Sequence, residues 1–216
     1  MVKLKIIDKL KKKSHKDIAL LQDMLIDIVY EVFPEAIFHG GTAIWRCYDG
    51  TRFSDDIDVY IKNDQKKLGI FKEKLKQRRT AIKEFKSTGN VVFSKLSLNS
   101  TEVRFEASFL KTKGKAIIKQ YETIEGNYLN ILTFSAEDLI IEKVKTYLSR
   151  LLVRDLYDIH HLLNYVEDKN KIKPYLKRLL SRYKKPKDEN ILETLVFVGA
   201  VPKTEQMLIK IKRWAK

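Results

Sequence analysis

Apolar residues recur along the first part of the chain with two different periods. Between residues 16 and 33 they lie three or four positions apart, which is the spacing of one helix face, and Pro34 ends that pattern. Short apolar or alternating runs follow, and they predict strands at residues 36–39, 56–61, 91–98, 102–110, 116–123 and 128–134. Further helices are expected at residues 43–48 and, with a basic surface, at 65–83.

The pattern changes to helix from Ser135 onward. Ser135 and Asp138 have the spacing of a capping box, and helical patterns then cover residues 153–166, 171–183, 189–197 and 204–214. An α/β part at residues 1–133 is therefore expected to precede an all-helical part at residues 134–216.

The net charge of the chain indicates the class of partner that it binds. The 216 residues are 44% hydrophobic, which is typical of a globular protein, but 43 Lys and Arg face only 28 Asp and Glu, for a formal net charge of +15. This one-sided excess of positive charge favours a nucleic-acid partner over a surface that is charged only for solvation. Basic stretches lie at residues 3–16, 66–86 and 171–187, and Tyr175 and Tyr183, in the last of them, are candidates for base stacking.

Cysteine usage and hydropathy indicate the compartment. Cys47 is the single cysteine, so an intrachain disulfide is excluded. The basic N-terminus lacks the apolar run and cleavage site of a signal peptide, and no segment approaches the ~20 apolar residues of a membrane span. A soluble, cytoplasmic protein without a membrane partner is expected.

Two carboxylates on one strand carry the main chemical prediction. Asp56 and Asp58 are separated by one residue, so both project from the same side of a strand while Ile57 points to the other. Two such neighbours stay ionised only beside cations, and Mg²⁺, or Mn²⁺, prefers oxygen ligands together with substrate phosphates. A pair of solvated edge residues is the alternative that the motif alone leaves open.

The preceding glycines and a later carboxylate support a phosphate-handling site. Gly40 and Gly41 permit close backbone approach to a triphosphate, and Thr42 adds a hydroxyl that could cap the next helix, although a simple tight turn has the same composition. Glu106 is the best candidate for a third metal ligand, with Glu102 as its rival.

Further charges gather in the helical part. Lys143 and Arg150 lie seven positions apart and share a helix face, which could meet a triphosphate or an RNA backbone. Arg154 and Asp158 have the spacing of a helix salt bridge, and Asp155 lies between them. Taken separately, these charges are also typical of a surface.

Together these segments resemble the AbiEii/AbiGii nucleotidyltransferase family, the toxin half of type IV toxin–antitoxin systems, which includes the MenT toxins. The resemblance rests on two blocks, residues 39–43 with 52–58, and Glu142-Lys143 with Arg150 and residues 154–158. It covers roughly residues 38–163. The family fold is a nucleotidyltransferase (polymerase-β-like) mixed sheet with flanking helices, followed by a C-terminal helical bundle.

The resemblance implies roles for individual residues. Gly41 and Thr42 would belong to the loop that grips the nucleotide, braced by Arg52 and Ser54. Asp56 and Asp58 would bind metal, with Glu106 as the weakest match. Lys143 would meet the triphosphate, and Asp155 would correspond to a late acidic residue needed for activity.

The expected reaction is transfer of a nucleoside monophosphate from an NTP to an acceptor hydroxyl, with release of pyrophosphate. The resemblance makes the 3′ end of tRNA the first choice of acceptor and implies a cognate antitoxin protein. A protein or small-molecule acceptor, and a non-catalytic RNA-binding module of the same fold, remain alternatives.

Overall fold

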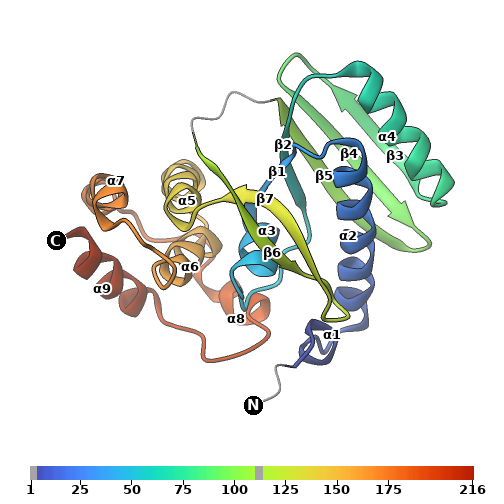
Figure 1. Ribbon diagram of the computed structural model, residues 1–216. Helices are drawn as coiled ribbons and strands as arrows, with labels where there is room; N and C mark the ends of the chain where they lie inside the picture. The colour runs from blue at the N-terminus through green and yellow to red at the C-terminus, as the bar shows by residue number, and fades with distance from the viewer. Residues whose placement is uncertain (1–3, 110–113) are drawn as a thin grey trace.

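A computed structural model describes residues 4–109 and 114–216 (Figure 1). Within these ranges the centre of the molecule is a seven-stranded mixed sheet with the order β3-β4-β5-β2-β1-β7-β6. The strands are β1 (Ile37–His39), β2 (Ile57–Ile61), β3 (Ala81–Ser87), β4 (Val91–Leu98), β5 (Thr101–Phe109), β6 (Ala116–Glu122) and β7 (Tyr128–Phe134). β1 runs antiparallel to β2 and parallel to β7, whereas β2 and β5 are parallel.

The helices of the described residues flank this sheet. They are α1 (Ile6–Lys9), α2 (Lys13–Val32), α3 (Gly40–Cys47), α4 (Gln65–Gln77), α5 (Ala136–Arg150), α6 (Val153–Leu162), α7 (Lys169–Ser181), α8 (Leu192–Leu195) and α9 (Thr204–Ala215), with a 3-10 turn η1 (Glu189–Ile191). In Figure 1, α2 and α4 lie on one side of the sheet, and α5, α6, α7 and α9 lie on the other.

The period-two pattern of the central strands decides which face is core. Ile57, Val59 and Ile61 of β2 are fully buried and join the hydrophobic cluster under α2 and α4. The alternate residues Asp58 and Tyr60 therefore project from the opposite face, toward the C-terminal helices. A buried, rigid sheet thus supports the polar side chains.

A second hydrophobic cluster joins the C-terminal helices to the front of the chain. It contains Leu139, Leu156, Leu176 and Ile211 from four helices, and it also includes Ile44 of α3. Ser135 caps α5 as expected, because its hydroxyl accepts a hydrogen bond from the Asp138 backbone N–H at 3.3 Å. The final segment returns to the sheet part of the chain.

That return is fixed by backbone hydrogen bonds. The Phe53 N–H donates to the Leu195 carbonyl at 2.8 Å, and the Phe197 N–H donates to the Thr51 carbonyl at 3.0 Å. The loop at residues 51–54, which lines the site described below, is therefore held by the C-terminal segment.

The expected helix at residues 65–83 is wrong at its C-terminal end. α4 ends at Gln77, Arg79 adopts a left-handed conformation with φ of 57°, and the chain enters the edge strand β3. An edge strand exposes half of its side chains, so its charged residues resemble a solvated helix face in the sequence. The end of the expected strand at Leu110, and residues 1–3, lie outside the described residues.

Other expected helices also have different bounds, and the one expected at residues 153–166 ends at Leu162. The helix expected to begin at Ala43 begins at Gly40 instead, directly after His39 of β1. The helix expected at residues 189–197 is a 3-10 turn followed by the single turn of α8.

Candidate active site

A cleft of about 520 Å³ separates the polar face of the sheet from α5 and α6. Its lining brings together most of the residues expected from the sequence. These residues are His39, Gly40, Gly41, Arg52, Ser54, Asp56, Asp58, Tyr60, Arg104, Glu106, Glu142, Lys143, Lys145, Thr146, Arg150 and Arg154. Acidic side chains dominate the sheet wall, and basic ones dominate the wall formed by the helices.

The sheet register places the acidic residues side by side. Asp58 of β2 is the backbone partner of Glu106 on β5 and of His39 on β1. Residues that lie opposite each other on neighbouring strands point to the same face of a sheet, so Asp58 and Glu106 project from the same face. Glu102, in contrast, pairs with Lys83 at 3.1 Å and does not line the cleft.

The surroundings of Glu106 and Asp56 oppose the ionisation of these two carboxyl groups. Burial raises the pKa of Glu106, and the neighbouring charge of Asp58 raises it further. Burial also raises the pKa of Asp56, although a hydrogen bond from Arg104 partly offsets this effect. A cation in the cleft would stabilise the ionised form of such a cluster of carboxylates.

The donor set fits a divalent ion that binds together with phosphates. Within residues 4–109 and 114–216, no three His, Cys, Asp or Glu side chains converge closely enough to form a complete cage. Mg²⁺ and similar ions are commonly held by only one or two carboxylates, with substrate phosphates as the remaining ligands. Asp58 and Glu106, in adjacent register, provide such a pair, and Asp56 lies beside them.

Both glycines are required by close approach of other groups. A Cβ on Gly40, whose φ is 77°, would lie 2.2 Å from Oδ2 of Asp58. A Cβ on Gly41 would lie 2.6 Å from both the Arg52 guanidinium and the Ser54 hydroxyl. The first turn of α3 can therefore come directly against the acidic residues and the 51–54 loop.

Thr42 lies in a different place from the one expected. Its side chain is fully buried, it does not line the cleft, and its hydroxyl donates a hydrogen bond to the backbone carbonyl of Asp56. The N-cap residue of α3 is His39, so Thr42 does not cap the helix. The hydroxyl thus holds the backbone of Asp56 in position.

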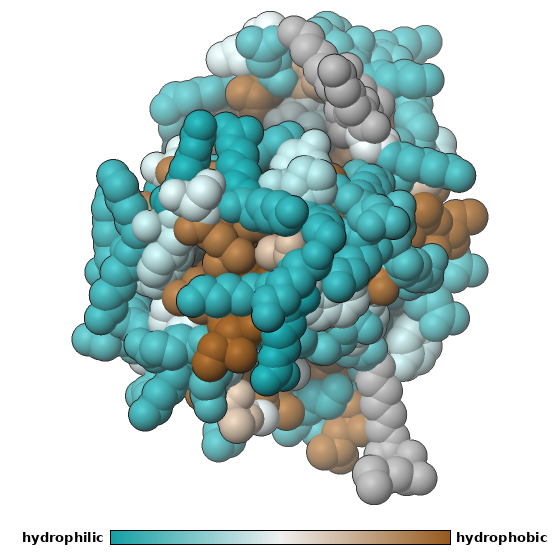
Figure 2. All heavy atoms as spheres, turned by 90° about the vertical axis from the view of Figure 1, so that its left-hand side faces the viewer, coloured by the Kyte–Doolittle hydropathy of each residue, from teal (hydrophilic) through white to brown (hydrophobic). Residues whose placement is uncertain are grey.

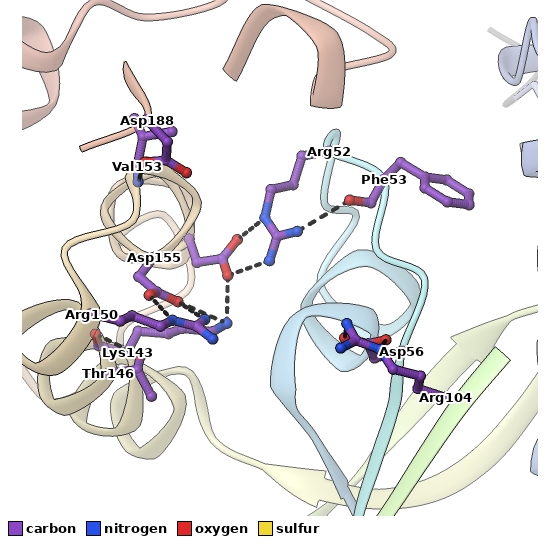
Figure 3. Close-up of polar contacts among 11 residues, drawn as sticks. Arg52, Phe53, Asp56, Arg104, Lys143, Thr146, Arg150, Val153, Asp155 and Asp188 are labelled. Atoms are coloured by element: carbon purple, nitrogen blue, oxygen red, sulfur yellow. Dashed lines mark hydrogen bonds and ion pairs between the residues drawn. The ribbon is translucent and has the colours of Figure 1, made fainter. Parts of the chain in front are cut away.

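A buried ion network joins the two walls at the back of the cleft. Arg52 donates two hydrogen bonds of 2.6 Å to Asp158, and the Lys143 ammonium lies 2.7 Å from the same carboxylate. Arg150 donates two bonds of 2.7 Å to Asp155, which is also 3.5 Å from Lys143 (Figure 3). All five side chains are therefore held by charge-assisted hydrogen bonds or ion pairs.

This network changes the interpretation of two acidic residues. The expected helix salt bridge between Arg154 and Asp158 is wrong, because Asp158 pairs with Arg52 and Lys143 instead. Asp155 is fully buried and does not line the cleft, so its direct effect is to orient Arg150 and Lys143. Burial opposes the ionisation of Asp158, but the two cations outweigh it and hold the pKa of this carboxyl below its usual range.

Some of the cleft residues were absent from the sequence-based site or had no role in it. Arg104 donates two hydrogen bonds to Asp56, and Glu142 accepts a 3.0 Å bond from the Tyr60 hydroxyl. The Nδ1 atom of His39 lies 3.5 Å from Glu142, and its ring stacks on Tyr60 at 4.1 Å. Arg104 is two positions from Glu106, and Tyr60 is two from Asp58, so strand alternation alone was a usable signal.

The sequence matches the family model for the nucleotidyl transferase AbiEii toxin of type IV toxin–antitoxin systems over residues 27–214. The chain belongs to the AbiEii nucleotidyltransferase toxin family. It is therefore a nucleotidyltransferase, and membership implies an NTP substrate, a divalent metal ion and an antitoxin partner. A search of curated proteins found no match.

Solved structures share the fold of this AbiEii family member. MenT4, a nucleotidyltransferase toxin from Mycobacterium tuberculosis H37Rv, superposes with a TM-score of 0.63 and 14% identity, covering 94% of this chain and 82% of MenT4. JHP933 from Helicobacter pylori gives a TM-score of 0.60 and 18% identity, covering 91% and 90%. The antibiotic-resistance factor ANT(2'')-Ia gives 0.50 and 16% identity, covering 78% and 93%.

These similarities confirm the expected fold class, an α/β nucleotidyltransferase sheet with flanking helices. None of the described helices has the length and apolar character needed to cross a membrane.

Proposed function

We propose that this AbiEii family member transfers a nucleoside monophosphate from an NTP to the 3′ end of tRNA in a reaction dependent on Mg²⁺ or Mn²⁺. The observation that carries this proposal is the pairing of opposite walls in one cleft, with Asp56, Asp58 and Glu106 on the sheet and Lys143 and Arg150 on α5. An NTP with its metal ions carries both signs of charge and fits between such walls.

The first part of the reaction is binding of the triphosphate. Gly40 and Gly41 leave room for the phosphates beside the first turn of α3, and Arg52 and Ser54 line the same end of the cleft. The Lys143 ammonium neutralises charge on the leaving pyrophosphate, and its position is set by Asp158 at 2.7 Å. In this proposal Asp155 and Thr42 are positioning residues.

The chemical step joins the acceptor to the nucleotide. The acceptor hydroxyl oxygen forms a bond to the α-phosphorus, the bond from that phosphorus to the bridging oxygen breaks, and pyrophosphate leaves while the hydroxyl proton passes to solvent. Asp56, Asp58 and Glu106 would hold the divalent ions, which would supply charge neutralisation and lower the pKa of the attacking hydroxyl. The chain contributes mainly positioning and electrostatic stabilisation.

The positive charge of the surface supports RNA as the acceptor. The formal net charge is +15, and α7 carries five cationic residues with no acidic one: Lys169, Lys171, Lys173, Lys177 and Arg178. Figure 2 looks onto the side of the molecule that bears α7 and α9, and hydrophilic side chains cover most of it around a narrow hydrophobic band. Such a surface attracts a phosphate backbone at long range.

Tyr175 of α7 and Tyr183 beyond its end, the two candidates for base stacking, are only partly exposed. Tyr183 stacks on Tyr147 with ring centroids 6.2 Å apart, and Tyr175 and Tyr183 are both partly buried against the C-terminal hydrophobic cluster. Their first role is to pack the helical part, so support for an RNA acceptor comes from charge rather than from exposed rings.

We further propose that the two parts of the chain contribute different groups to the cleft. Residues 1–133 would form the nucleotidyltransferase part that carries the carboxylates, and residues 134–216 would form the helical part that supplies Lys143 and Arg150. Neither part alone contains a complete cleft, since both contribute to its lining.

The test is incubation of the purified protein with Mg²⁺, total tRNA and each labelled NTP in turn, beside Asp58→Asn. Label that enters RNA with one NTP, and is absent for the variant, supports the proposal. Label on protein or on a small molecule would move the acceptor to that class, and metal-dependent NTP binding without transfer would favour a non-catalytic RNA-binding module. Transfer to RNA should also weaken strongly as salt rises.

Two glutamates of β5 provide a matched comparison for the metal site. Glu106 lines the cleft beside Asp58, whereas Glu102 lies outside it and pairs with Lys83. Glu106→Gln should lower transfer by about 100-fold or more, because it removes one charge from the metal site. Glu102→Gln should retain activity. Equal activity of the two variants would remove Glu106 from the site.

A further inference from the structure

Arg104 forms a close ion pair with a proposed metal ligand. Its Nε donates to Oδ1 of Asp56 at 2.7 Å, and its Nη2 donates to Oδ2 at 2.6 Å. Both residues line the cleft, and Figure 3 shows them together on the sheet wall, away from the network around Asp155. Both oxygens of the carboxylate are therefore bonded to one guanidinium.

The strand register explains why this arginine reaches Asp56. β2 and β5 are parallel, with Ile57 opposite Phe105 and Asp58 opposite Glu106. Continuing that register by one residue brings Asp56 opposite Arg104. Arg104 also shares a face with Glu106, because the two are separated by one residue on a strand.

The pair places a positive charge where a metal ion would bind. A guanidinium and a divalent cation repel each other, so the two cannot favourably use the same carboxylate at short range. With Arg104 in place, the acidic residues of the free protein have a counter-ion of their own. A metal ion that binds through Asp56 must first displace this side chain.

Because Arg104 is exposed, its displacement costs little free energy. Half of its side chain is exposed (50%), and the partly exposed pair with Asp56 is of a kind that stabilises a protein only weakly. Arg52 is the contrast within the same cleft. Its side chain is 5% exposed, and it donates to both oxygens of Asp158 and to the Phe53 carbonyl at 3.1 Å. Arg52 is fixed, whereas Arg104 is free to exchange partners.

We propose that Arg104 is a displaceable counter-ion, which holds Asp56 in the free protein and transfers to the phosphate oxygens of the NTP when a divalent ion takes Asp56. This inference rests on the proposed function, because it assumes that Asp56 binds metal. Arginine suits the second partner, since its planar fork binds phosphate with two charge-assisted hydrogen bonds. Metal and nucleotide should then each strengthen the binding of the other.

Binding of Mn²⁺ measured by the electron paramagnetic resonance of the free ion tests this exchange on the full chain without turnover. Each measurement is made without nucleotide and with the α,β-methylene analogue of each of the four NTPs in turn, in which the bond to be broken is blocked. The variants are Arg104→Ala, Arg104→Lys and Asp56→Asn. Lys95→Ala is the control, because Lys95 is the partly exposed β4 partner of Arg104 and pairs with Glu84 instead.

The proposal predicts opposite effects on the two affinities. Arg104→Ala should bind Mn²⁺ alone about fivefold more tightly, because one ion pair no longer competes with the metal. The same variant should bind the analogue with Mn²⁺ about tenfold more weakly, because it lacks the phosphate contact. Arg104→Lys should fall between it and the wild type, and Lys95→Ala should remain within about twofold of wild type in both measurements.

Failure of this inference is distinguishable from failure of the proposed function. If Asp56→Asn binds Mn²⁺ as well as the wild type, Asp56 is not a metal ligand and both proposals are wrong on that point. If Asp56→Asn loses Mn²⁺ but Arg104→Ala binds it no more tightly than the wild type, only the counter-ion role is refuted. Tighter Mn²⁺ binding with unchanged analogue affinity refutes the transfer to phosphate.

Discussion

Replacement of Asp158 by asparagine tests whether the buried network holds the two walls of the cleft together. Asp158 is 1% exposed, and its carboxylate joins Arg52 of the 51–54 loop to Lys143 of α5 through contacts of 2.6, 2.6 and 2.7 Å. Asparagine keeps the size of the side chain but removes its charge. Two buried cations then lose their shared counter-ion, with Asp155 as the remaining carboxylate near Lys143.

The size of the effect follows from the burial of the carboxylate. Removing one partner of a buried ion pair typically costs about 3–5 kcal/mol, because the remaining charge stays desolvated. We expect Asp158→Asn to lower the free energy of unfolding by about 3 kcal/mol, since the asparagine carbonyl still accepts one hydrogen bond. For a protein of this size the melting temperature should fall by about 6–12 °C.

The pH dependence gives a second, independent signature. The pKa of Asp158 is lowered in the folded state, so its stabilisation is complete above the unfolded value of about 3.9 and is lost as the pH falls through the folded pKa. The difference in stability between wild type and Asp158→Asn should therefore be constant near neutral pH and shrink below about pH 4. Urea denaturation followed by circular dichroism at several pH values measures both quantities.

The control is a carboxylate whose ion pair lies in solvent. Glu73 and Lys76 are about two-thirds exposed and lie 2.8 Å apart on α4, so Glu73→Gln should change stability by less than about 0.5 kcal/mol. If Asp158→Asn were as mild as this control, the network would not hold the walls together and the argument from burial would fail.

Two further predictions concern the first turn of α3. Gly40→Ala should abolish nucleotide transfer and destabilise the fold, because its Cβ would lie 2.2 Å from Asp58. As the control, Gly69→Ala on the open surface of α4 should stabilise the protein by about 0.5–1 kcal/mol. Transfer assays and thermal melts compare the two variants, and a fully active Gly40→Ala would refute the close approach of Asp58 to Gly40. Thr42→Val should lower nucleotide transfer without weakening NTP binding, since the Thr42 hydroxyl holds the backbone of Asp56. Thr42→Ser, which keeps a hydroxyl, should restore transfer. Loss of NTP binding in Thr42→Val would instead indicate that Thr42 contacts the nucleotide directly.

Local patterns in the sequence determined much of the fold. Period-two alternation identified β2 and placed Asp56 and Asp58 on one side, because the direction of a strand side chain depends only on the backbone of its neighbours. Helical periodicity and the Ser135 cap located α5 for the same reason, since both signals lie within a few residues. The two motif blocks also indicated the family to which the chain belongs.

Some sequence patterns are compatible with two different local structures, and the sequence alone could not distinguish them. The first residues of β3 were assigned to the preceding helix because a charged edge strand and a solvated helix face have similar compositions. The expectation that Thr42 caps the following helix was wrong, because a hydroxyl after two glycines is equally suited to a helix cap and to a buried hydrogen bond.

Only the tertiary structure decided which side chains meet. The sequence left Glu102 as a rival of Glu106, and the register of β5 against β2 brought only Glu106 into the cleft. The two bonds from Arg104 to Asp56 depend on the same register. Arg52 and Asp158 are 106 residues apart in the chain, and nothing in their local patterns pairs them. Side-chain direction is a local property that a sequence encodes within a few residues, whereas the choice of partner depends on how distant elements pack.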